Sequence, residues 1–176
     1  MMKKSILILG LIFLAMFCPI ACSSDDENGI QPVDENANKT FPVIEDKLDA
    51  AIVSFFNEAL PNHPCYRPVE TFFIPATEDT NAYSLINNEQ ELQEAYKGYK
   101  DLPKIDFEKY TLIIGRVYTG GVTVDQQYLT KEKEDNVLVL HLAHEAVIAE
   151  MFYTYYWGVY PKMTADHITI QLVYEK

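Results

Sequence analysis

Residues 105–121, which read IDFEKYTLIIGRVYTGG, decide how the rest of the chain is organised. Within this stretch, residues 110–118 are apolar on both faces as far as Arg116, which is typical of a central strand covered on both sides. Thr119-Gly120-Gly121 follows, and glycine can supply the positive φ angles of a tight hairpin because it has no Cβ. We therefore predict a buried central strand that ends in a hairpin at the two glycines.

Four further strands are predicted after the central one, because apolar and polar residues recur there with a period of two. They span residues 122–130, 137–142, 151–160 and 167–175. In the last of them Ile168, Ile170 and Leu172 share one face, so we predict a half-buried antiparallel strand. Shorter strand-like runs lie at residues 69–74 and 83–86.

Two helices are predicted before the central strand. Residues 44–60 repeat apolar side chains at steps of three and four, and Pro61 ends that helix. Asn88 caps the second helix, and Glu91 at its third position can reach back as in a capping box. Its apolar face consists of Leu92, Ala95, Tyr96 and Tyr99, with Gly98 placed to end it. The sequence thus predicts an α+β fold, with an antiparallel β-sheet or small sandwich of about five to seven strands and two packed helices.

The N-terminus has the features of a bacterial lipoprotein signal peptide. Two lysines precede an apolar run at residues 6–17, which is shorter than the roughly 20 residues that a membrane-spanning helix needs. The sequence PIAC at residues 19–22 resembles a lipobox, with proline where leucine is usual. We therefore predict a signal peptide at residues 1–21 and lipidation of Cys22.

An acidic segment with few large apolar side chains follows the cysteine. Residues 22–40 cannot offset their ordering entropy by burial, so we predict a flexible acidic tether there and a single globular domain at residues 41–176. The sequence SSDDE at residues 23–27 resembles a tag that exports lipoproteins to the outer face of the outer membrane. After cleavage, 12 basic residues of the 14 remain against 26 acidic ones, and a formal charge of −14 disfavours nucleic acid as a partner. We expect a cell-surface lipoprotein of the outer membrane, held by its lipid anchor.

Candidate catalytic and metal-binding residues are few. No serine of the mature chain lies in a Gly-x-Ser-x-Gly motif. His141 and His144 would share a face on a helix, whereas the strand predicted there sends residues three apart to opposite faces. His63 and Cys65 form a pair without a third ligand, and Cys65 is the only cysteine left for a disulfide within the domain. We therefore expect no enzyme activity, no metal, no cofactor and no internal disulfide.

The strand predicted at residues 151–160 is the most aromatic part of the chain. Alternation places Tyr153, Tyr155 and Trp157 on one face. The other face holds Phe152, Tyr156 and Tyr160. If the first face is exposed, it offers a platform for sugar rings or for a protein partner. The other interpretation is a strand buried on both faces under a helix.

Several of these features together resemble a known family. They are the capped helix NEQELQEAY, the lead-in Ile105-Asp106-Phe107, the apolar strand, Thr119-Gly120-Gly121 and the late Tyr160-Pro161-Lys162. These motifs are similar to the C-terminal domain of PrcB, an accessory lipoprotein of a bacterial surface protease complex. The similarity covers residues 83–174, about half of the chain, and Val122 stands where the family usually has an aromatic residue. It implies a module that binds or stabilises a partner.

Two functional hypotheses follow. In the first, this surface-anchored lipoprotein binds a protein, as an accessory or stabilising subunit of an extracytoplasmic protease. The protein contact would be an apolar, glycine-rich tip formed by Tyr118, Thr119, Gly120, Gly121 and Val122. The alternative is a glycan-binding surface lipoprotein that uses the aromatic face of Tyr153, Tyr155 and Trp157.

We expect Cys22→Ala to release the protein from the membrane fraction as a soluble or unprocessed species. Lipoprotein maturation supplies more than one acyl chain, and a single chain would bind a bilayer only marginally. Detergent phase partitioning of the wild type and the variant measures this directly. An unchanged membrane fraction after the substitution would exclude the lipid anchor.

Overall fold

The computed structural model of the chain describes residues 40–42, 48–75, 81–132, 135–144 and 150–175. These residues belong to one compact unit, Asp34–Lys176. The predicted signal peptide, Cys22 and nearly all of the predicted tether lie outside the described residues. So do the first residues of the predicted N-terminal helix.

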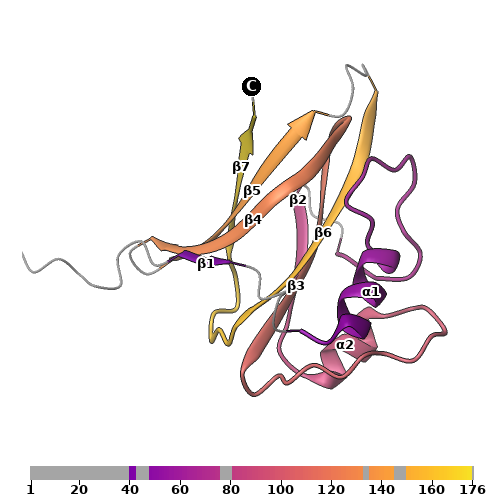
Figure 1. Cartoon of the computed structure of the whole chain (residues 1–176), viewed down its shortest axis with the longest axis vertical. Coiled ribbons are helices and arrows are strands. Elements are labelled where there is room, and N and C mark those ends of the chain that lie inside the picture. The colour runs from indigo at the N-terminus through magenta and orange to yellow at the C-terminus, as the bar shows by residue number, and fades with distance from the viewer. Residues whose placement is uncertain (1–39, 43–47, 76–80, 133–134, 145–149, 176) are drawn as a thin grey trace, which may run out of the picture. The chain divides into compact units, whose positions relative to one another are not determined.

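The described residues form two β-sheets and two helices, which confirms the predicted α+β class (Figure 1). One sheet has the order β2 (Asn81–Ile86), β3 (Tyr110–Gly120), β6 (Met151–Pro161), and all its pairs are antiparallel. The other has the order β1 (Thr40–Pro42), β4 (Val122–Glu132), β5 (Asp135–His144), β7 (Thr169–Tyr174). The helices are α1 (Ala50–Ala59) and α2 (Glu89–Ala95).

Strand β3 is the central strand that the sequence predicts. It pairs with β2 along one edge and with β6 along the other. Leu112 and Ile114 face a core shared with the helices, whereas Ile113 and Val117 face a second core shared with β4 and β5. These four side chains are fully buried, so the strand is enclosed on both edges and both faces.

The tight hairpin predicted at Thr119-Gly120-Gly121 is wrong. Strands β3 and β4 belong to different sheets, and the glycines carry the chain around a corner between them. Both edges of β3 are already occupied by β2 and β6, so β4 has no free edge on β3 with which to pair. Thr154 ties the corner to β6, because its Oγ1 donates a buried hydrogen bond of 2.7 Å to the Val122 carbonyl oxygen.

The last strand is also oriented differently from the prediction. Strand β7 pairs with β5 in parallel, from Val137 opposite Thr169 to Leu142 opposite Tyr174. The preceding strand β6 lies in the other sheet, so the chain crosses over before β7 begins and can enter beside the start of β5. Alternation of apolar and polar residues reports which face is buried, but it does not report strand direction.

Each helix begins at the residue directly after its N-cap. Asp49 caps α1 by accepting a 2.8 Å hydrogen bond from the Ala51 N–H, so this helix begins later than its apolar pattern suggests. The predicted N-cap of α2 is confirmed, since Asn88 Oδ1 accepts from the Glu91 N–H at 2.9 Å. The Glu91 carboxylate reaches back to the N–H of Asn87 at 2.6 Å.

The strand expected at residues 69–74 reduces to a single bridge. Phe72 pairs there with Tyr96, and the rest of the run is irregular. The Phe72 side chain is nevertheless 5 % exposed and stacks on Phe56 at 5.8 Å between ring centroids. The apolar run therefore contributes to the core without forming a strand.

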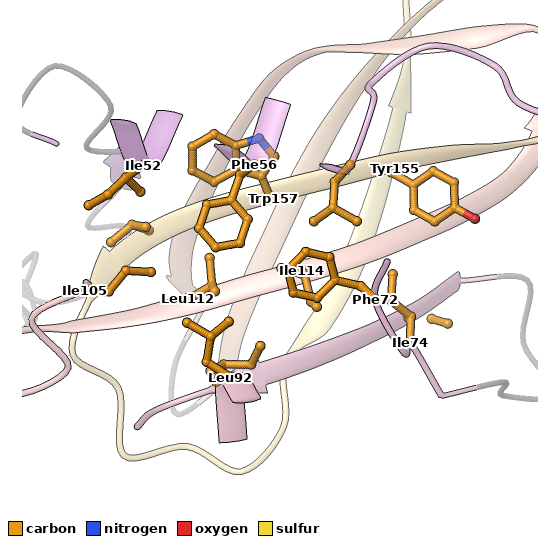
Figure 2. Close-up of a cluster of buried hydrophobic side chains, with 14 residues drawn as sticks. Ile52, Phe56, Phe72, Ile74, Leu92, Ile105, Leu112, Ile114, Tyr155 and Trp157 are labelled. Carbon is orange, nitrogen blue, oxygen red and sulfur yellow. The ribbon is translucent and has the colours of Figure 1, made fainter. Parts of the chain in front are cut away.

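Two apolar cores lie on the two faces of the β2-β3-β6 sheet. The first joins α1 and α2 to that sheet, and Figure 2 shows Phe56, Phe72, Leu112, Ile114 and Trp157 packed within it. The second fills the space between the two sheets. Its fully buried members include Ile113, Val122, Leu138, Leu140, Leu142 and Tyr160.

A glycine inside β3 makes room for an aromatic ring. Gly115 lies directly opposite Tyr156 of β6, and a Cβ at position 115 would overlap the phenol end of that ring. Tyr156 is 2 % exposed, so its ring has little freedom to move aside. Glycine normally weakens a strand, but here the aromatic ring covers the backbone that it leaves bare.

We expect Gly115→Ala to lower the free energy of unfolding by about 1–3 kcal/mol, because an overpacked core must shift a buried side chain. Chemical denaturation of the variant and of the wild type gives the difference. Tyr156→Leu supplies the control, since leucine lacks the ring atoms that the new methyl would meet. If Gly115→Ala costs the same in both backgrounds, contact with Tyr156 does not explain the glycine.

Candidate functional site

The predicted aromatic platform on β6 is buried. Tyr153, Tyr155 and Trp157 do share one face of the strand, but that face packs into the core formed with α1 and α2. Tyr155 is 1 % exposed and Trp157 is 4 % exposed. The Phe56 ring stacks on Trp157 at 5.0 Å between centroids, within the cluster that Figure 2 draws. Two of the three side chains therefore cannot reach a ligand in solution.

The polar atoms of these two buried aromatic residues are bonded inside the protein. The Trp157 indole N–H donates to Asn57 Oδ1 at 2.9 Å, and the Tyr155 hydroxyl accepts from the Val69 N–H at 2.8 Å. Burial raises the pKa of the Tyr155 phenol, because desolvation disfavours the phenolate. Their role is therefore to hold α1 and residue 69 against the sheet.

The opposite face of β6 is buried as well. Tyr156 and Tyr160 lie in the core between the two sheets. Phe152 is 4 % exposed, and the Tyr66 ring covers it at 4.5 Å between centroids. Of the two interpretations that the sequence allows, burial on both faces is the correct one for most of this strand.

Some residues of the predicted glycine-rich tip are exposed and others are buried. Tyr118 is 37 % exposed, and Thr119 and Gly120 are partly exposed. Gly121 is buried, and Val122 is fully buried in the core between the sheets. Val122 therefore cannot contact a partner, which corrects the predicted site at that position.

Large side chains nevertheless gather around the exposed part of the corner. We call this surface the aromatic end and define it by Tyr66, Tyr118, Met151, Tyr153 and Tyr174. Tyr118 lies opposite Tyr153 with 4.7 Å between ring centroids, and Met151 lies opposite Gly120. The Tyr174 hydroxyl lies 3.5 Å from Thr119 Oγ1. Tyr66 joins the group through Phe152, which follows Met151 in the chain.

Three members of the aromatic end were missed by sequence reasoning: Tyr66, Met151 and Tyr174. Tyr66 is 73 % exposed and comes from the proline-rich loop after α1, where no periodic pattern marks which side chains face solvent. Tyr174 continues the apolar face of β7, but it is 49 % exposed because it lies at the end of that strand. Their position beside the corner depends on chain crossings that local sequence does not encode.

The polar groups of the aromatic end carry both signs of charge. The Arg116 guanidinium lies 4.9 Å from the centroid of the Tyr153 ring, a cation–π distance. On the other side, the Tyr66 hydroxyl donates to Glu150 at 3.1 Å, and this carboxylate raises the pKa of the phenol. The Arg116–Tyr153 pair is partly exposed, and both residue types are enriched among the residues that contribute most to protein binding.

The backbone beneath the aromatic end is held in place. The Cys65 N–H donates to the Tyr153 carbonyl oxygen at 2.8 Å, and the Tyr153 N–H donates to the Cys65 oxygen at 2.9 Å. These bonds attach the loop after α1 to the outer edge of β6. Cys65 forms no disulfide with any described residue, and burial raises the pKa of its thiol.

The histidines singled out in the sequence lie on strand β5 and at its end. His141 Nδ1 is 3.8 Å from Glu175, and its ring lies 5.8 Å from that of Tyr128. His144 is exposed, with its ring 6.2 Å from that of Tyr174. Among the described residues, no three His, Cys, Asp or Glu side chains come together as a possible metal site.

Comparisons of the chain with protein-family models, curated proteins and solved structures found no match. Within the described ranges, no helix is both long enough and apolar enough to span a membrane. The geometry of the aromatic end is therefore the basis for a functional proposal.

We expect Val122→Asp to destabilise the protein by several kcal/mol, because it places a carboxylate in a sealed apolar core. Thr123→Asp is the matched control, since it adds the same charge one residue later on a partly exposed side chain. Thermal unfolding monitored by circular dichroism compares the two. Equal melting temperatures would show that position 122 is accessible to solvent.

Proposed function

We propose that this protein is a surface-anchored lipoprotein whose domain binds a protein partner at the aromatic end without catalysing a reaction. The observation that carries the proposal is the gathering of exposed large side chains around the corner between β3 and β4. Tyr66, Tyr118, Met151 and Tyr174 are between 37 % and 73 % exposed. They come from four separate parts of the chain, and each belongs to or contacts the same end of the β3–β6 pair, at residues 118–120 and 151–153.

The chemistry of this surface favours a protein as its ligand. Tyrosine and arginine contribute disproportionately to protein interfaces, because they combine large apolar area with a polar group. Arg116 and Tyr153 are already stacked, so little side-chain freedom would be lost on binding. The paired backbone of Cys65 and Tyr153 limits the movement of the surface in the same way.

The resemblance to the PrcB C-terminal domain supports an extracytoplasmic protease as the partner and an accessory or stabilising role for this chain. The predicted lipid anchor at Cys22 would hold the domain at the outer surface of the outer membrane. Both remain proposals that rest on the sequence. The motifs of the resemblance also serve the fold, since Ile105 is 6 % exposed and Tyr160 is fully buried.

The surface on which the glycan-binding alternative was based is mostly buried. It depended on a face of β6 on which Tyr155 and Trp157 would be exposed together, and both are buried. Tyr153 is the one member of that face which remains partly accessible, and its ring is already in contact with Tyr118 and Arg116. We therefore favour protein binding at this end of the domain.

We expect an aromatic photo-crosslinker at position 118 or 66 to capture one protein in intact cells. Position 99 is the matched control, because Tyr99 is a fully exposed tyrosine outside the aromatic end. Tyr118→Ala should then weaken binding of the captured protein by more than 1 kcal/mol, or about fivefold in Kd, without changing the melting temperature. Wild-type affinity in a normally folded Tyr118→Ala and Tyr66→Ala double variant would refute the proposal.

A further inference from the structure

Tyr99 departs from the sequence prediction in a way that points to a second binding site. The apolar spacing of α2 places this side chain on the buried face of the helix. The helix instead ends at Ala95, and Tyr99 is 97 % exposed, more than any other large apolar side chain among the described residues. An exposed phenol ring contributes nothing to folding by burial, so its surroundings decide what it does.

The segment that carries Tyr99 is ordered by its own contacts. A Cβ at Gly98 would overlap the Tyr96 ring, so only glycine lets this ring lie across the backbone. The Tyr96 hydroxyl accepts from the Lys100 N–H at 3.1 Å, and the Lys97 N–H donates to the Thr71 carbonyl oxygen at 2.8 Å. The backbone on both sides of Tyr99 is therefore held in place, while its side chain projects into solvent.

The core anchors the same segment through Tyr96. Its ring lies 5.2 Å from Phe72 and 5.5 Å from Phe55 between centroids. Lys100 forms a solvent-exposed ion pair with Glu58 of α1 on the far side of the segment. Tyr96 and Tyr99 thus present one fixed and one free aromatic ring beside each other on the surface.

A hollow of about 520 Å³ lies between α2 and residues 98–104. Tyr96 and Tyr99 both line it, and a smaller hollow of about 140 Å³ on the side of α1 shares these two residues. The larger volume lies in the range of small-molecule sites, roughly 300–1,000 Å³. Gln93 of α2 adds an amide to its wall.

Residues of both charges line the larger hollow. They are Glu89, Asp101, Lys100 and Lys104, and the Lys100 ammonium is already paired with Glu58 of α1. A strongly anionic ligand would meet the carboxylates, and a cationic one would meet the lysines. The best complement is a neutral ligand with many hydroxyl groups, which can both donate to carboxylates and accept from ammonium and amide groups.

We propose that this hollow binds a neutral carbohydrate, with the Tyr99 ring stacked on a sugar ring. The C–H face of a pyranose is apolar and fits against a phenol ring, whereas its hydroxyl edge fits the surrounding polar groups. The site is separate from the aromatic end, because α2 begins three residues after Ile86, which pairs with Leu112 at the opposite end of β3 from Tyr118. It therefore does not rest on the proposed protein-binding function.

The test is affinity electrophoresis of the full-length chain in native gels that contain xylan, glucomannan or dextran, with polygalacturonate as an anionic comparison. At least one neutral polysaccharide should retard the wild type. Tyr99→Ala should weaken that binding about tenfold and leave the melting temperature unchanged, since it removes a side chain with no buried contacts. The matched control Tyr66→Ala removes another exposed tyrosine and should bind the sugar normally.

Three results would overturn the carbohydrate site. The first is the absence of retardation by every neutral polysaccharide, or retardation by polygalacturonate alone. The second is equal retardation of Tyr99→Ala and the wild type. The third is a protein adduct formed by a photo-crosslinker at position 99, which would make this hollow a protein contact.

Discussion

The complete enclosure of β3 is the constraint on which the rest of this structure depends. Strands β2 and β6 occupy its two edges, the helices cover one face, and β4 and β5 cover the other. Because no edge remains, the chain must turn away after Gly120 and begin a second sheet. The corner at Gly120, the two-sheet sandwich and the aromatic end all follow from the lack of a free edge on β3.

The sequence predicts well those features that depend on neighbouring residues. The α+β class, the central strand and the N-cap at Asn88 all rest on local spacing or on a single side chain, and all are confirmed. The direction of β7 and the absence of a hairpin at Gly120 depend on which strand edges are still free. Which edges are free is determined only when the sheets assemble. The alternation of apolar and polar residues along one strand does not encode it.

The aromatic residues show why the candidate sites were harder to predict than the fold. Alternation correctly grouped Tyr153, Tyr155 and Trp157, but it could not show that α1 would cover them. Tyr66 and Tyr99 lie outside regular strands and helices, and these are the most exposed tyrosines described. The most exposed tyrosine side chains lie in loops that are anchored on the sheet. Candidate binding residues therefore lie in segments whose sequence has no periodic apolar pattern.

The parallel pairing of β5 with β7 has a consequence for the order of folding. Between these partners the chain forms β6, which belongs to the other sheet, so the second sheet cannot close until both later strands have been made. Leu138, Leu140 and Leu142 of β5 are fully buried only in the finished sandwich. Until β7 has been made, one edge of this apolar strand has no partner, which is a form that aggregates readily.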